Sequence, residues 1–228
     1  MTEEKLAHVW VGGYKKLKND PAFGPWVRRI GSIQLPVSDA TPFFYLVRAI
    51  CHQQLAGKAA RTIHGRFIEA VGRDVSPDNV LRLSESTMRG AGLSGNKMRA
   101  IRDLATKIKS GELEVHDLET KSDEEIVSRL TFVKGIGEWT AHMFLIFRLH
   151  RPDVWPVGDL AVRVGYAKVQ GMAEGLSKRE LKPLGDLYRP WRSAAAWYCY
   201  SCLLYTSDAA ADTPCVDLGR RRIIKKKR

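Results

Sequence analysis

The sequence contains no apolar run that approaches the roughly 20 residues needed to cross a lipid bilayer. Its first ten residues, MTEEKLAHVW, lack the basic start and the apolar core of a secretory signal. A hydrophobic share of 44% and a charged share of 27% are those of an ordinary folded protein, which excludes large-scale disorder. We therefore expect a protein without a membrane partner. It should stay in the cytoplasm, associated with the nucleoid in a bacterium, or in the nucleus of a eukaryote.

Cysteine is scarce, with only Cys51, Cys199, Cys202 and Cys215 in 228 residues. Cys199 and Cys202 form a CxxC pair, a spacing found in zinc and redox sites. No second pair stands at a zinc-ligand spacing, and the four cysteines do not match an iron–sulfur motif. The pair also lies in an apolar stretch, AAWYCYSC. We therefore expect reduced, partly buried thiols, no iron–sulfur cluster and no required cofactor.

Acidic residues are outnumbered, 25 against 37 lysines and arginines, so the formal net charge is +12. A chain this basic is expected to meet a polyanion, most often nucleic acid. The charge is unevenly placed, because residues 203–228 hold seven basic and three acidic residues, a net of +4, and end in RRRIIKKKR. The rest of the chain carries +8, so the argument for a polyanionic partner holds in a weaker form.

Strand-like alternation is also scarce, and the only β-type stretch runs from Ile33 to Val37. Elsewhere the apolar periodicity is helical and the connections are short, which favours an all-α domain of two helical lobes with a central cleft. Ser122, followed three residues later by Glu125, predicts a capping box. We expect helices at about residues 3–18, 41–53, 56–71, 77–90, 96–110, 122–132, 137–149, 159–169, 177–187 and 191–202.

The helical domain is expected to span residues 1–201. From 202 to 228 the chain loses sustained amphipathic periodicity and ends in the basic run. Two interpretations stay open. The segment is either a disordered tail that binds nucleic acid, or non-native sequence that resembles translated adapter read-through. In either case we expect it to contribute little to function.

The most informative stretch is a tight turn between two helices, Lys134-Gly135-Ile136-Gly137. The two glycines permit backbone torsions and close approaches that a β-carbon would block. The turn presents amide groups at the start of the next helix, where a phosphate oxygen can bind, and Lys134 adds a positive charge. A bare GxG is by itself more often an ordinary helical corner.

The residues after this hairpin make the signal specific. Trp139, Met143 and Phe147 recur at i, i+4 and i+8, a face that lines either a cleft or the core. Asp159 then opens another helix, 22 residues after the second glycine. An aspartate at this position is a favoured helix N-cap, but amide donors there also stabilise an anion, so capping and catalysis are compatible.

Together these features resemble the helix-hairpin-helix (HhH-GPD) DNA glycosylase superfamily, and within it the DNA-3-methyladenine glycosylase II, or AlkA, type. Three further segments carry the likeness: ICHQQLAGKAARTIHGRF at 50–67, AGLSGNKMRAIRDLA at 91–105 and YRPWRSAAAWY at 188–198. The likeness covers roughly residues 40–201. The N-terminal β domain of some relatives has no counterpart, so the chain is similar to the compact members.

The resemblance implies base excision repair, in which the enzyme flips a damaged base out of duplex DNA and hydrolyses its N-glycosidic bond. Asp159 would be the catalytic carboxylate. Trp139 and Tyr200 would line the base pocket, although simple core packing remains an alternative for Tyr200. Met143 and Leu160 stand where AlkA-type pockets have tyrosines, which leaves the lesion preference open. Bifunctional relatives place a lysine at position 139, so tryptophan there implies a monofunctional enzyme that leaves an abasic site.

The same resemblance implies the DNA contacts. Gln54, or its neighbour Leu55, would be the wedge that fills the gap left by the flipped base. The alternative is a plain helix connection whose glutamines bond to backbone. The hairpin would hold DNA phosphate through Lys134, Gly135, Gly137 and Thr140. The backbone carbonyls of Thr131, Val133 and Ile136 would hold a monovalent cation that bridges to that phosphate.

Two other functions remain open at this point. One is a non-catalytic DNA-binding module that kept the hairpin, which Asp159 and Trp139 argue against because phosphate binding requires neither. The other is a glycosylase for oxidised or deaminated bases. The expected partner in every case is double-stranded DNA, bound by a monomer.

Overall fold

The computed structural model describes residues 3–35, 40–55, 57–72 and 74–207, and these segments form helices without any strand. The α-helices are α1 (Glu3–Lys18), α2 (Phe23–Ile30), α3 (Pro42–His52), α4 (Gly57–Val71), α5 (Pro77–Arg82), α6 (Glu85–Gly90), α7 (Gly95–Lys109), α8 (Asp123–Thr131), α9 (Glu138–Phe147), α10 (Leu160–Val169), α11 (Lys178–Leu184) and α12 (Arg192–Ser207). Two short 3₁₀ helices, η1 (Leu118–Thr120) and η2 (Gly185–Tyr188), complete the described part.

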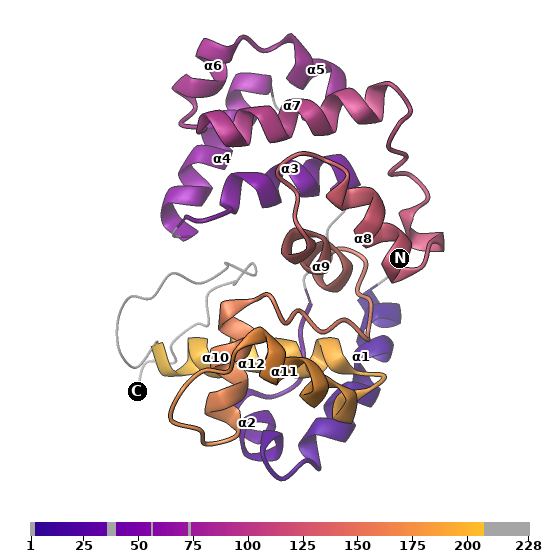
Figure 1. Ribbon diagram of the computed structural model, residues 1–228, viewed down its shortest axis with the longest axis vertical. Helices are drawn as coiled ribbons and strands as arrows, with labels where there is room; N and C mark the ends of the chain where they lie inside the picture. Colours follow the sequence, from indigo (N-terminus) through magenta and orange to yellow (C-terminus); the bar gives the residue numbers. More distant parts are fainter. Residues whose placement is uncertain (1–2, 36–39, 56, 73, 208–228) are drawn as a thin grey trace.

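The helices form two lobes (Figure 1). The middle of the sequence, α3 to α8, makes one lobe, drawn at the top. The two ends of the described chain make the other lobe, where α1 and α2 pack with α12, and α10 packs along α12. Helix α9 lies between the lobes and packs on α3 and α8. The prediction of an all-helical, two-lobed fold is confirmed for the described residues.

Helix α9 is the most enclosed element of the site region. Its residues Thr140, Ala141 and Met143–Phe147 are all buried. A helix that is apolar on every side belongs in the interior of a domain. The first turn of α9 is therefore held rigidly where the lobes meet.

Local capping explains several helix starts. The Ser122 hydroxyl accepts a hydrogen bond from the Glu125 amide, and the Glu125 carboxylate accepts one from the Ser122 amide, which confirms the predicted capping box of α8. In the other lobe, α10 and α12 approach closely because residue 165 is glycine. A β-carbon there would lie 2.2 Å from the Cys199 carbonyl oxygen. This contact fixes the direction of α10, whose N-cap residue carries the candidate carboxylate.

Four details differ from the sequence predictions. Ile33 to Leu35 form no strand, and Val37 lies outside the described residues. Helix α2 was not expected. The helix predicted at 77–90 is two helices, because Leu83 is extended and Ser84 caps α6 by accepting from the Thr87 amide at 3.1 Å. Helix α12 runs to Ser207, past the predicted domain end at 201, and Leu203 packs against the core.

The remaining predictions on thiols and membranes have these outcomes. Cys51, Cys199 and Cys202 are free and buried, and Cys215 lies outside the described residues. The Cys202 thiol donates to the Cys199 carbonyl at 3.1 Å. In the part of the chain that the structure describes, no helix has the length and apolar character needed to cross a membrane.

Candidate active site

Asp159 caps α10, as its position in the sequence predicted. Its Oδ1 accepts a hydrogen bond from the Val162 amide at 3.0 Å, and the residue is only 5% exposed. A buried carboxylate is stable only when hydrogen-bond donors or charges compensate for the lost water. The helix start supplies one such donor.

The second donor comes from another helix. The indole N–H of Trp139, in the first turn of α9, donates to Oδ2 of Asp159. Each carboxylate oxygen thus accepts from a different element, which fixes both the position and the plane of the group. Oxygen lone pairs remain for further contacts, because an ionised carboxylate accepts about four hydrogen bonds. The structure therefore brings two of the predicted site residues together at the junction of the lobes.

The other predicted base-pocket residues divide into two groups. Met143 and Tyr200 touch, with the Tyr200 hydroxyl 3.4 Å from the Met143 sulfur, and both are at least 94% buried. The Tyr200 ring also lies 6.0 Å from that of Phe147. Leu160 differs from these residues, because it is 64% exposed next to Asp159. Only Trp139 and Leu160 are partly open to solvent.

The hairpin between α8 and α9 has the predicted turn, but not all its amides are available. The Ile136 amide donates to the Val133 carbonyl at 3.1 Å, and the Lys134 amide donates to the Asp103 carboxylate at 2.8 Å. The amides of Gly135 and Gly137 make no such bond within the described residues. An incoming anion would therefore meet these two amides and the first turn of α9.

The two hairpin glycines have different roles. Gly135 has a φ of +84°, and a β-carbon on it would lie 2.7 Å from that of Ala100 in α7. Gly137 has an extended backbone, φ −98°, and a β-carbon there would point into open space. Packing within the protein therefore requires a glycine at 135 but not at 137.

One predicted hairpin contact, that of Thr140, needs adjustment, and the predicted cation ligands differ in their hydrogen bonds. The Thr140 side chain is 2% exposed and its hydroxyl accepts from Gln53, so only the Thr140 backbone amide is placed for an external contact. The carbonyls of Thr131 and Ile136, two of the three predicted cation ligands, accept no hydrogen bond from the described residues. The carbonyl of Val133, the third, accepts from Ile136.

The connection between α3 and α4 carries the predicted wedge residues on its surface. Gln54 is exposed and has a φ of +54°, a torsion that non-glycine residues rarely adopt. Leu55 is 37% exposed. The preceding residue, Gln53, is partly buried, and its side chain donates to the Gly135 carbonyl of the hairpin. The alternative that these glutamines bond to backbone therefore holds for Gln53.

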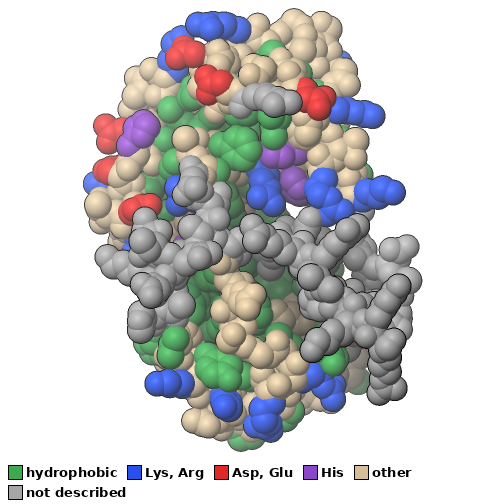
Figure 2. Space-filling view, turned by 180° about the vertical axis from the view of Figure 1, so that it is seen from behind, with side chains coloured by type: hydrophobic (Ala, Val, Ile, Leu, Met, Phe, Trp, Pro, Cys, Tyr) green, Lys and Arg blue, Asp and Glu red, His purple; other side chains and the backbone are tan. Residues whose placement is uncertain are grey.

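The surface around this connection is basic. From Thr41 to Ile68 the sequence has no acidic residue and four basic ones, Arg48, Lys58, Arg61 and Arg66. Figure 2 shows Lys, Arg and His side chains where this part of the upper lobe faces the lower one, with no acidic side chain among them. Lys97 of α7 donates to the Cys51 carbonyl at 2.8 Å and so supports the end of α3.

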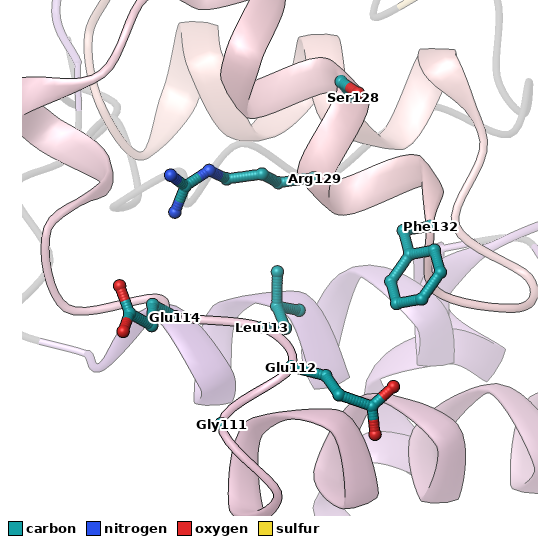
Figure 3. Close-up of a pocket in the computed structure, with 7 residues that line it drawn as sticks. All are labelled: Gly111, Glu112, Leu113, Glu114, Ser128, Arg129 and Phe132. Carbon is teal, nitrogen blue, oxygen red and sulfur yellow. The ribbon is translucent and has the colours of Figure 1, made fainter.

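A surface cavity of about 410 Å³ lies elsewhere on the upper lobe (Figure 3). It is lined by Gly111–Glu114, Ser128, Arg129 and Phe132, and none of the predicted base-pocket residues takes part. Phe132 is 57% exposed and its ring centroid lies 4.0 Å from the Lys107 ammonium. This cavity is therefore separate from the candidate site.

The CxxC pair shows no features of a metal site. No three His, Cys, Asp or Glu side chains of the described residues are grouped as metal ligands. Burial raises the pKa of the Cys202 thiol to about 12. Burial also raises the pKa of Cys199, and the nearby Cys202 and Asp159 raise it further. Thiols held in the protonated form are poor nucleophiles and poor ligands.

Two residues of the site region were missed from the sequence. Gln53 joins the wedge connection to the hairpin, and Asp103 holds the Lys134 amide. Gln53 lies next to the predicted wedge residue, which was a usable signal. Asp103 stands among basic residues on α7, and no local pattern marked it.

Comparison with known proteins now identifies relatives. Residues 47–190 match the family described as HhH-GPD superfamily base excision DNA repair protein. DNA-3-methyladenine glycosylase 1 of Schizosaccharomyces pombe is 36% identical over 162 residues, which cover 70% of this chain and 71% of the relative.

Solved structures agree with this result. The S. pombe 3-methyladenine DNA glycosylase Mag1, in complex with abasic DNA, is similar with a TM-score of 0.79 and 32% identity, covering 89% of this chain and 100% of that one. A DNA-3-methyladenine glycosidase of Bacillus halodurans is similar with a TM-score of 0.75 and 33% identity, covering 86% of this chain and 91% of the other.

Proposed function

Because the chain belongs to the HhH-GPD superfamily of base excision DNA repair proteins, we propose that it is a monofunctional DNA glycosylase that removes alkylated purines from duplex DNA. The relatives named above act on 3-methyladenine according to their names, which supports this substrate class. The observation that carries the proposal is the buried Asp159 carboxylate, held by Trp139 and Val162 beside a hairpin with open amides.

Asp159 acts on the sugar. As the bond between base and sugar breaks, positive charge develops on the sugar ring, and a fixed anion nearby lowers the barrier electrostatically. The same carboxylate can orient the attacking water. No general acid is required, because a purine methylated at N3 or N7 is already cationic and leaves as a neutral base.

Trp139 and its neighbours recognise the base. The half-buried indole ring attracts a cationic purine through stacking and cation–π contact. Met143 follows Trp139 by one helical turn and, with its partner Tyr200, forms the inner wall of the site. Leu160 contacts the base from the exposed side. Because residue 139 is not lysine, the enzyme forms no Schiff base and leaves the strand intact.

The hairpin and the wedge hold the DNA. The amides of Gly135, Gly137 and Thr140, with the Lys134 ammonium, bind a phosphate at the start of α9. Gln54, or Leu55 beside it, enters the base stack and fills the gap left by the flipped nucleotide. The basic residues of α3 and α4 add a sequence-independent attraction to the backbone.

The hairpin also fits a monovalent cation. Carbonyl oxygens suit a hard cation, and those of Thr131 and Ile136 are free while that of Val133 keeps one lone pair. These three carbonyls would hold the ion, which adds positive charge beside the phosphate. Exchanging sodium or potassium for tetramethylammonium at constant ionic strength should then weaken DNA binding. Equal affinity in both salts would contradict the cation site.

The activity is tested with methylated duplex DNA and an assay for released bases. We expect the wild type to release 3-methyladenine and 7-methylguanine and to leave the strand uncut. The variant Asp159→Asn keeps the helix cap, because asparagine still accepts from Val162. Its rate should fall at least about a hundredfold, since the anion is lost. The matched control Asp78→Asn changes an exposed carboxylate far from the site and should retain full activity.

Each part of the proposal has its own contrary result. No base release by the wild type would overturn the enzymatic function and favour a DNA-binding module. Release of oxidised or deaminated bases alone would overturn the substrate class. Full activity of Asp159→Asn would overturn the role of that residue, and strand cleavage without alkali would overturn the monofunctional mechanism.

A further inference from the structure

One side chain links the two loops that the proposed function assigns to DNA. The amide nitrogen of Gln53 donates to the Gly135 carbonyl at 3.0 Å and to the Thr140 hydroxyl at 3.2 Å. Gln53 directly precedes the wedge residue Gln54, and the two partners lie in the hairpin turn and in the first turn of α9. The bonds therefore connect segments that are 82 and 87 residues apart in the sequence.

The surroundings of the Gln53 side chain suit an amide group, because they offer two hydrogen-bond acceptors to its nitrogen. The side-chain nitrogen of glutamine has two protons, one for each acceptor. The Gln53 backbone is also anchored, because its N–H donates to the Ile50 carbonyl at the end of α3. A leucine would fill the space without donating, and a glutamate would place a carboxylate against the Gly135 carbonyl.

Helix α7 holds the same two loops separately. Lys97 donates to the Cys51 carbonyl, two residues before Gln53, and Asp103 accepts from the Lys134 amide, one residue before Gly135. The last turn of α3, which leads into the wedge loop, and the hairpin are thus both tied to α7, and Gln53 joins the two loops directly. Next to Thr140, Trp139 bonds to Asp159, so the linked elements reach the candidate carboxylate.

We propose that Gln53 is a positioning residue that fixes the wedge loop relative to the phosphate-binding hairpin. This inference rests on the proposed function, in which both loops hold DNA. Base flipping requires the wedge to enter the stack while the hairpin grips the backbone, and small errors in such alignment lower rates strongly. Gln53 keeps the two contacts in one geometry.

The test compares base release from two duplexes under single-turnover conditions. One has a 7-methylguanine paired with cytosine, and the other has the same lesion in a one-nucleotide bulge, where no pair must be opened. For Gln53→Leu we expect release about tenfold slower from the paired duplex and less than twofold slower from the bulge. The affinity for DNA should change less than the rate does, since the phosphate contacts stay in place.

Two further variants and a control sharpen the comparison. Thr140→Val removes one acceptor and should give a smaller defect of the same kind. The double variant should be no slower than Gln53→Leu alone, because both changes break one linkage. The control Gln170→Leu removes a similar amide bond, to the Tyr188 hydroxyl in the other lobe, and should leave the ratio of the two rates unchanged.

Equal slowing on both duplexes, an unchanged rate, or additive effects in the double variant would overturn the positioning role. If Gln53→Leu fails to fold, Gln53→Glu removes the donor with less change of shape and is judged by the same ratio. If the wild type releases no base, the proposed function fails instead. The fluorescence of 2-aminopurine beside the lesion then measures flipping alone, and an equal signal from wild type and variants overturns the inference.

Discussion

The indole N–H of Trp139 donates to the carboxylate of Asp159 across the junction between α9 and α10. With only the hydrogen bond from the helix cap, the plane of an aspartate carboxylate could still turn about that bond. Here the second donor belongs to a helix that is buried on nearly every side, so the carboxylate has one orientation. The bond also places the Trp139 ring next to the anion, so that a cationic base could stack on the ring close to the carboxylate.

The variant Trp139→Phe tests what this bond does. It keeps an aromatic ring and removes only the donor, so base stacking should largely persist while the carboxylate loses its fixed orientation. We expect the single-turnover rate to fall by about one order of magnitude and the affinity for abasic DNA to change less. Base release and equilibrium DNA binding measure the two effects. Trp197→Phe is the matched control, and an unchanged rate in Trp139→Phe would contradict the role of the bond.

The sequence was sufficient where function is encoded locally. The hairpin glycines, the capping aspartate and the helix periodicity all lie within short windows, and the structure has the expected fold. The sequence was insufficient for Gln53 and Asp103. Their hydrogen bonds span 82 and 31 residues, and contacts between such distant segments leave no periodic pattern in the sequence. Helix α2 was missed for another reason. The helix has only 8 residues and Gly24 lowers its local propensity, while burial of side chains in the core stabilises it.

The two hairpin glycines provide a matched pair. Gly135→Ala should destabilise the fold by about 2 kcal/mol, because it combines a left-handed torsion with a close contact to Ala100. Gly137→Ala should leave the stability within about 0.5 kcal/mol of wild type, yet weaken DNA binding, because its new methyl group points into open space beside the amides proposed to bind phosphate. Urea unfolding and DNA titration separate the two effects. Loss of stability in Gly137→Ala with normal binding would contradict this division.

Asp103 should stabilise the conformation of the hairpin. Burial raises the pKa of its carboxyl, but the bonds from Lys107 and from the Lys134 amide outweigh that effect and hold the pKa below its usual range. Asp103→Ala removes both bonds. We expect the Lys134 amide to exchange with deuterium about tenfold faster, and DNA affinity to fall with it. Asp78→Ala removes an exposed ion pair on the same lobe and should change neither quantity. Unchanged exchange at Lys134 would show that the hairpin turn keeps its conformation without Asp103.

The basic C-terminal run is tested by truncation. Since α12 extends to Ser207 and Leu203 packs against the core, the deletion must begin at residue 208 to leave the fold intact. We expect the shortened protein to release bases at the wild-type rate in moderate salt. A large loss of DNA affinity, together with a shallower dependence on salt, would show that the run contacts phosphate.

His64 should make the stability of the protein depend on pH. Its Nε2 is buried without a hydrogen-bond partner among the described residues, and its ring lies edge-on to Phe44 and 5.8 Å from the ring of His52. Burial, with the charges of His52 and Arg48, lowers the pKa of His64 from 6.5 to about 4. Between these two values the unfolded chain binds a proton that the folded protein does not. The titration of His64 therefore costs no unfolding free energy above about pH 6.5, and the unfolding free energy decreases as the pH falls from there toward 4.

The variant His64→Phe removes this proton linkage and keeps an aromatic ring beside Phe44. Between pH 7 and pH 4.5, the wild type should lose roughly 2 kcal/mol more of its unfolding free energy than the variant does. Urea unfolding at the two pH values measures this difference. His52, whose ring neighbours that of His64, is the last residue of α3 and stands two residues before Gln54, so a charged His64 should also disturb the wedge. Base release by the wild type should then decline at low pH more steeply than release by His64→Phe. Parallel pH profiles for both proteins would show that His64 takes up its proton without penalty and that the wedge is independent of it.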